Sequence, residues 1–171
     1  VYDYDPDKAK ALLAEAGYAD GFTIDLYAEA PAHEAEAIMG DLAKVGIKAN
    51  LKFMQYRALR DLVWKNETPV NHMTWGSNSI PDVSAITSHF FEGGRDDFAK
   101  DPEVMEALQK ADSSTDPDVR EALYRTALTK ISGELYWLPM FTYAKYYAFS
   151  RDLDFKTTPD EIPRFYTAKW K

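Results

Sequence analysis

The residues best suited to chemistry lie between positions 75 and 82, where an indole, small polar side chains and a carboxylate follow one another. They belong to the stretch 71–91, in which a short apolar run ends at a Gly-containing polar loop and a helical pattern then begins at Pro81. Hydroxyls, an amide, backbone N–H groups and an indole face suit a polar ligand. The stretch therefore predicts a ligand-binding loop. Its candidate residues are Trp75, Gly76, Ser77, Asn78, Ser79 and Asp82.

The same loop has a purely structural interpretation. Trp75 would then end a strand inside the core, and the serines would be turn formers. We favour binding because a buried Trp usually needs a partner for its indole N–H.

Metal binding and catalysis have weaker support. The absence of cysteine excludes disulfides, thiolate catalysis and cysteine-based zinc sites. His33, His72 and His89 fall on separate predicted elements, so we expect surface or capping histidines and no metal site. No G-x-S-x-G, P-loop or G-x-G-x-x-G motif occurs, and the pair Asp96-Asp97 fits a solvated turn. We expect neither an enzyme nor a bound cofactor.

The composition of the chain limits the classes of protein to which it can belong. The 171 residues are 46% hydrophobic and 14% aromatic, which suffices for the core of one domain or of one lobe of a larger protein. The net charge of -8 argues against nucleic acid as a partner. No apolar run approaches the roughly 20 residues of a membrane span, and the start at Val1 shows no signal-peptide pattern. We expect a processed chain or, more simply, a fragment.

Hydrophobic periodicity predicts the elements that position the loop. Asp-Pro pairs at 5–6, 101–102 and 116–117 are typical helix starts, with Asp as N-cap and Pro at the first helical position. Alternation and aromatic density predict strands at 22–27, 47–54, 70–75 and within 136–149. Helical spacing predicts helices at 6–16, 31–45, 58–65, 82–89, 102–111 and 117–131. The alternation up to residue 75 predicts an α/β fold with a mixed, largely parallel sheet flanked by helices.

The last segment of the chain is rich in aromatic residues. Phe165, Tyr166 and Trp170 lie within six residues of one another. We expect this apolar tail to dock on another surface.

Several short motifs follow one another in a recognisable order. They are YDPDKAKALLAEAGY at 4–18, DGF at 20–22, AEAI at 35–38, LAKVGIK at 42–48, Trp75-Gly76, the Asp116-Pro117 helix with ALY at 122–124, and WLPM at 137–140. In order and spacing the chain resembles the C-terminal part of family 5 extracellular solute-binding proteins. This is the dipeptide, oligopeptide and nickel class that serves ABC importers, and the resemblance covers essentially the whole chain.

The resemblance implies an exported protein about three times longer, whose two lobes close on a ligand with no bond made or broken. Residues 1–149 would form the second ligand-binding lobe, with the fold of one lobe of a type II periplasmic binding protein. Residues 150–171 would be a tail that returns to the missing first lobe. The implied partners are a small-molecule or peptide ligand and the ABC permease. The implied location is the periplasm, or the outside of the membrane in a Gram-positive host.

The resemblance also implies roles for individual residues. Peptide binders of the family commonly carry, where Asn78 stands here, an Asp that holds the ligand's α-ammonium. An amide lacks the charge that strengthens such a bond. Asp82 matches a second acidic position and would either compensate or cap the next helix. Tyr143 would line the cleft, and Arg57 would either meet an anionic group or remain solvated.

The departure at Asn78 leaves the ligand open between peptides, modified peptides, opines, oligosaccharides and metal chelates. A function from another class is a signalling or chaperone-like binding module that uses the same lobe without transport.

Overall fold

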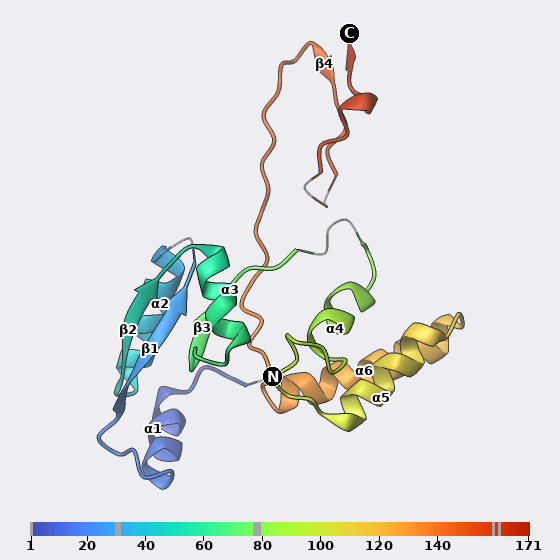
Figure 1. The fold of residues 1–171 in the computed structure, drawn as a ribbon. Helices are drawn as coiled ribbons and strands as arrows, with labels where there is room; N and C mark the ends of the chain where they lie inside the picture. The colour runs from blue at the N-terminus through green and yellow to red at the C-terminus, as the bar shows by residue number, and fades with distance from the viewer. Residues whose placement is uncertain (1, 30–31, 77–79, 159, 161) are drawn as a thin grey trace. The chain divides into compact units, whose positions relative to one another are not determined.

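A computed structural model describes residues 2–29, 32–76, 80–158, 160 and 162–171 (Figure 1). The chain divides into two compact units, Val1–Trp75 and Gly76–Lys171, and each has a hydrophobic core of its own. Among the described residues, no helix combines the length and the apolar character that crossing a membrane requires.

The first unit alternates helices and strands, as the periodicity predicted. Its elements are α1 (Pro6–Glu15), β1 (Phe22–Ala28), α2 (Ala32–Lys44), β2 (Ile47–Phe53), α3 (Tyr56–Trp64) and β3 (Val70–His72). The three strands form one parallel sheet in the order β2-β1-β3 (Figure 1).

The register of this sheet brings the carboxyl ends of the three strands level. Ala28 at the end of β1 lies opposite both Phe53 of β2 and His72 of β3. The backbone N–H of Met54 then donates to the Ala28 carbonyl at 3.0 Å. Whatever follows β1, β2 and β3 in sequence therefore starts along one edge of the sheet.

Helix α2 covers β1 and β2 (Figure 1). The core of the first unit joins buried Leu26, Ala28, Ala35 and Ala49. Ile38, Met39 and Leu42 from the predicted inner face of α2 pack against them. Burial of one apolar stripe against a sheet is what stabilises an amphipathic helix of this length.

Two glycines allow the chain to pack closely at the amino edge of the sheet, where β1 and β2 begin. Gly21 before β1 and Gly46 before β2 have φ values of +72° and +89°, a region that glycine enters without steric cost. A Cβ on Gly21 would lie 1.9 Å from the carbonyl oxygen of Gly46. Only glycine fits at position 21.

The second unit is mainly helical. Its elements are α4 (Ser84–Phe90), α5 (Pro102–Ser113), α6 (Pro117–Gly133), β4 (Leu153–Asp154), the 3-10 helix η1 (Phe165–Thr167) and β5 (Lys169–Trp170). Both long helices start at the predicted Asp-Pro pairs. The Asp101 carboxylate accepts from the N–H groups of Glu103 and Val104, and that of Asp116 accepts from Asp118 and Val119.

Helices α5 and α6 pack side by side and contribute most of the second core (Figure 1). Phe90 and Phe91 at the end of α4 complete this core, and the Trp137 ring packs on Phe90 with centroids 4.1 Å apart. Its buried residues from α5 and α6 are Val104, Ala107, Leu108, Ala111, Tyr124, Ala127 and Ile131.

The strands predicted within 136–149 are wrong. Residues 137–150 are neither helix nor strand, and many of their large side chains are exposed, with Tyr146 at 93%. A strand exists only through hydrogen bonds to a neighbour, so aromatic residues with high β-propensity do not form one where the ladder is missing. The predicted strand 70–75 is likewise shorter, because only Val70–His72 pairs with β1.

Residues after 150 form a local hairpin. Leu153 pairs with Trp170 and Asp154 with Lys169 in an antiparallel ladder, while Phe165, Tyr166 and Trp170 remain 73–83% exposed. The parallel sheet with its flanking helices confirms the predicted α/β class, and among the described residues the antiparallel pair β4-β5 is separate from that sheet.

Candidate ligand-binding site

The carboxyl edge of the β2-β1-β3 sheet carries the candidate site of the first unit. Ligands of open α/β sheets bind outside the carboxyl ends of the strands, where loops expose polar groups. Glu29 follows β1 at this edge, and Thr74 and Trp75 lie just beyond β3. Trp75 is 37% exposed, so this residue is partly accessible three positions beyond the end of β3.

Glu29 is a residue of this edge that sequence reasoning missed. Its Oε1 accepts hydrogen bonds from the backbone N–H and the hydroxyl of Thr74, at 3.1 and 3.2 Å. The contact joins positions 45 residues apart and depends on the pairing of Ala28 with His72. The predicted strand 22–27 was the available signal, since the residues that follow a central parallel strand lie at the binding edge.

Ser77, Asn78 and Ser79 lie outside the described residues. Gly76 is exposed, and a Cβ built on it meets nothing within 4 Å.

Asp82 in the second unit is held by protein groups. Its Oδ1 accepts from the N–H of Ser84, the first residue of α4, at 2.9 Å. Both carboxylate oxygens accept from Arg120 Nη2, at 2.9 and 2.8 Å. The hydrogen bonds from Ser84 and then the charge of Arg120 lower the pKa of Asp82 below its usual value. Asp82 therefore accepts from the first residue of α4, although the N-cap of that helix is Val83, and it forms an ion pair with a residue 38 positions away.

Arg120 is itself fixed by its surroundings. Its Nη1 donates to the Ala111 carbonyl at 3.0 Å, and its Nη2 lies 3.3 Å from the Tyr124 hydroxyl. That hydroxyl donates to Asp112. Burial and then the Asp112 carboxylate raise the pKa of Tyr124 to about 12, so the hydroxyl remains a donor across the ordinary pH range. This network ties the segment after the loop to α5 and α6.

Tyr143 lies in the irregular segment 137–150 and is 43% exposed. Its ring meets that of Phe141 edge to face at 5.5 Å, and Lys145 Nζ lies 5.4 Å from its centroid. Arg57 lies exposed in the first turn of α3.

The three histidines lie on separate elements, as the sequence predicted. His33 is exposed in the first turn of α2. His72 Nε2 lies 3.4 Å from the buried Glu34 carboxylate, and His89 Nε2 lies 3.1 Å from Asp96. Within the part of the chain that the structure describes, no three His, Asp or Glu side chains are close enough to share a metal ion.

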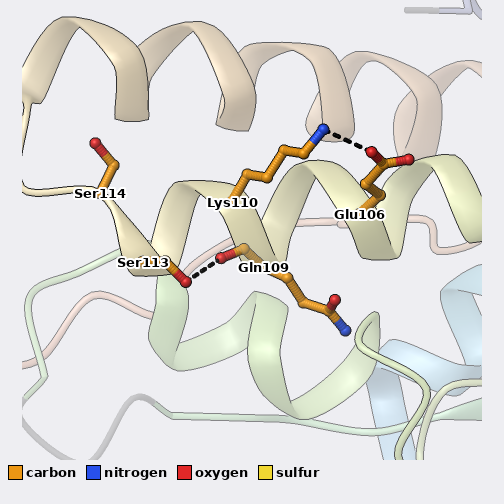
Figure 2. Close-up of a pocket in the computed structure, with 5 residues that line it drawn as sticks. All are labelled: Glu106, Gln109, Lys110, Ser113 and Ser114. Atoms are coloured by element: carbon orange, nitrogen blue, oxygen red, sulfur yellow. Dashed lines mark hydrogen bonds and ion pairs between the residues drawn. The ribbon is translucent and has the colours of Figure 1, made fainter.

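A shallow pocket in the second unit lies along α5 and is unrelated to the predicted loop (Figure 2). Lys110 pairs there with Glu106 at 2.5 Å, and the Ser113 hydroxyl donates to the Gln109 carbonyl at 2.7 Å (Figure 2). These are contacts within one helix on its solvent face, so we assign no site to this pocket. Its lining residues are Glu106, Gln109, Lys110, Ser113 and Ser114.

Comparison with known proteins adds sequence relatives. The profile described as bacterial extracellular solute-binding proteins, family 5, middle region, matches residues 1–98. Heme-binding protein A of Haemophilus influenzae and di/tripeptide-binding protein 2 of Pseudomonas aeruginosa are each 32% identical to this chain over 152 residues. The matches cover 81% of this chain but only 28% of each relative.

The fold is shared with a solved structure. A dipeptide binding protein from a Pseudoalteromonas species, in complex with Met-Leu, superposes with a TM-score of 0.83 at 24% identity. The superposition covers 98% of this chain and 36% of that one. The common fold thus extends over almost every residue of this chain and over about a third of that dipeptide binding protein.

Proposed function

Because the chain belongs to the family 5 bacterial extracellular solute-binding proteins, as its motifs predicted, we propose that it is part of the solute-binding component of an ABC import system. This family consists of binding proteins, so the proposed role is capture and release with no bond made or broken. The captured solute is peptide-like or another small polar molecule. It is delivered to a permease in the membrane.

The observation that carries this proposal is the placement of Trp75. A partly exposed indole directly beyond β3, at the carboxyl edge of a parallel sheet, offers an apolar face beside polar groups. Pockets for small polar solutes combine aromatic walls with a few placed hydrogen-bonding groups. Trp75 would be the wall, and Gly76, Ser77, Asn78 and Ser79 would supply hydrogen bonds.

The other candidate residues have supporting roles. Asp82 would keep the end of the loop in place through Ser84 and Arg120, and a direct contact with ligand would require it to give up part of that pairing. Tyr143 would line the cleft from the segment after Pro139. A structure of the protein with its ligand bound would test the proposed roles of Asp82 and Tyr143.

The domain arrangement follows from the family. Residues 1–149 would form the second ligand-binding lobe, and 150–171 would return to the first lobe of the longer protein. The strong exposure of Phe165, Tyr166 and Trp170 supports a docking role for this tail. The protein would act in the periplasm, or outside the membrane in a Gram-positive host.

The ligand class rests on the relatives. One is named for di- and tripeptides and another for heme, so a peptide is the first solute to test. The alternative of a signalling or chaperone-like module has no supporting observation among the described residues.

The test is a thermal-shift screen of the full-length protein against dipeptides, tripeptides, opines, oligosaccharides and heme. For each solute that raises the Tm, Trp75→Ala should weaken binding about tenfold or more in calorimetry, since one aromatic contact plus its buried area exceeds about 1.4 kcal/mol.

Tyr18→Ala is the matched control. Tyr18 is a half-exposed aromatic residue that precedes β1, at the opposite edge of the same sheet, and its loss should leave binding unchanged. Equal binding by Trp75→Ala and the wild type would refute the site, whereas a screen without any hit would refute the function.

A further inference from the structure

The Glu92 carboxyl group, two residues beyond the end of α4, has surroundings that do not suit a charge. Its Oε1 is buried and has no hydrogen-bond partner among the described residues. A buried oxygen without a partner costs much less on a neutral carboxyl than on a carboxylate, where it carries part of the charge. The geometry of this atom therefore favours a protonated Glu92.

Asp112, near the end of α5, is the acceptor for that proton. The two carboxyl groups lie within hydrogen-bonding reach of each other, and they can form this bond only when one of them carries a proton. Burial, and then the hydrogen bond and charge of Asp112, raise the pKa of Glu92 above its ordinary value of 4.5. Asp112 Oδ1 also accepts from the Tyr124 hydroxyl, so Asp112 is a shared acceptor for two donors.

The Tyr124 hydroxyl connects this pair of acids to the other end of α4. It donates its one proton to Asp112, and its lone pairs can still accept from Arg120 Nη2 at 3.3 Å. Arg120 pairs with Asp82, whose Oδ1 accepts from the first residue of α4. Helix α4 is thus held at its start through Asp82 and at its end through Glu92, and both attachments meet at Tyr124.

The charged groups around the pair belong to this same network. Asp112 acts on Glu92 directly, and Arg120 and Asp82 act on Tyr124. The remaining titratable residue of α4, His89, pairs with Asp96 at 3.1 Å.

We propose that Glu92 and Asp112 share one proton, and that the loss of this proton to water as the pH rises loosens the hold on α4 and on Asp82 at the end of the candidate ligand loop. The protonated pair joins α4 to α5 by a hydrogen bond. The ionised pair replaces that bond with two facing negative charges and leaves part of one charge on the buried Oε1.

The direction of the pH dependence follows from the raised pKa of Glu92. The stabilisation is fully present below about pH 4.5, the ordinary pKa of this side chain, and is lost as the pH rises through the raised pKa. The end of the loop is therefore held more firmly in acidic than in alkaline surroundings. This regulation goes beyond the capture of a solute.

Native-state hydrogen exchange of the full-length protein, without any solute, tests the pair. The protection of the α4 amides is compared between Glu92→Gln and the wild type at the same pH, so that the intrinsic pH dependence of exchange cancels. The side-chain amide of the variant can donate to Asp112 at every pH. Protection should stay close to the wild type at about pH 4 and exceed it about threefold at about pH 8, a modest factor because Asp112 is exposed and water screens the pair.

Asp112→Asn is the second variant. Its amide oxygen still accepts from Tyr124, and the facing charges are removed, so protection of α4 should again rise only at the higher pH. The double variant Glu92→Gln/Asp112→Asn should add little to either single change, because both remove the same repulsion.

Glu106→Gln is the matched control. It removes the same charge from an exposed residue of α5 that pairs with Lys110 at 2.5 Å, and it should not raise the protection of α4 at either pH.

A gain in protection that is confined to the higher pH and common to Glu92→Gln and Asp112→Asn supports the shared proton. Unchanged or lower protection in Glu92→Gln at that pH overturns it. So does a gain of equal size at both pH values, a gain in Glu106→Gln, or a gain that Asp112→Asn does not reproduce. Because no solute is added, none of these outcomes bears on the proposed function, which the thermal-shift screen tests separately.

Discussion

Single side chains decide how the helices of the second unit begin. Asp101 and Asp116 both cap a helix whose next residue is Pro, but their surroundings differ. Asp101 also accepts from the Tyr136 hydroxyl at 2.7 Å and pairs with Lys130 at 2.9 Å. Tyr136 and then Lys130 hold the pKa of the Asp101 carboxyl well below its usual range. For Asp116 the contacts are those of the cap.

Asp101→Asn should therefore lower the Tm at pH 7 by several degrees, because the amide keeps the cap but loses the charge. The lowered folded-state pKa means that the charge stabilises the protein above about pH 4, the unfolded value of Asp, and that this contribution is lost as the pH falls further. The difference in Tm between the variant and the wild type should shrink from pH 4 to pH 2. Scanning calorimetry over this range measures it.

Asp116→Asn is the control for capping alone, since Asn caps about as well as Asp. Its Tm at pH 7 should stay close to the wild type. If the Tm falls equally in Asp101→Asn and Asp116→Asn, the contacts of Asp101 with Tyr136 and Lys130 add no stability beyond that of the helix cap.

At the scale of elements, Arg120 connects the start of α4, the end of α5 and the second turn of α6. It does so through Asp82, the Ala111 carbonyl and Tyr124. Arg125 on the same helix differs, because it pairs with Glu121, four residues earlier, and both side chains are about 70% exposed. Removal of Arg120, which joins several elements, should therefore cost more stability than removal of Arg125, which pairs with a residue of its own helix.

Arg120→Ala should lower the free energy of unfolding by about 1–3 kcal/mol, through the loss of hydrogen bonds to a charged group. Arg125→Ala should cost at most a few tenths of a kcal/mol, as is usual for exposed pairs one turn apart. Urea denaturation measures both. Equal losses would mean that the Arg120 network does not join the three helices energetically.

At the scale of the whole molecule, two cores share one chain. Leu26 belongs to the core of the first unit and Leu108 to that of the second, and each is almost completely buried. Local opening of a compact unit exposes mainly the groups of that unit. The two cores should therefore respond separately to a cavity.

Leu26→Ala should lower the free energy of opening of amides in β1 by about 2–5 kcal/mol, the usual cost of such a cavity, and leave α5 and α6 unchanged. Leu108→Ala should do the reverse. Native-state hydrogen exchange measures both regions in one experiment. A similar loss of protection in both units from either variant would show that they open as one.

Local sequence patterns predicted the family, the α/β class and, to within two residues, the starts of helices α1 to α6. Helix caps and alternating strand patterns depend on residues only a few positions apart. The Asp-Pro pairs that begin at Asp5, Asp101 and Asp116 were therefore enough to predict where three helices start. The sequence also predicted a strand before Trp75, although that strand ends at His72, three residues earlier. The tertiary structure decided the contacts between distant positions: Glu29 with Thr74, Asp82 with Arg120, and the absence of a strand around Tyr143. The reason is physical, since register and pairing arise only when separate segments meet.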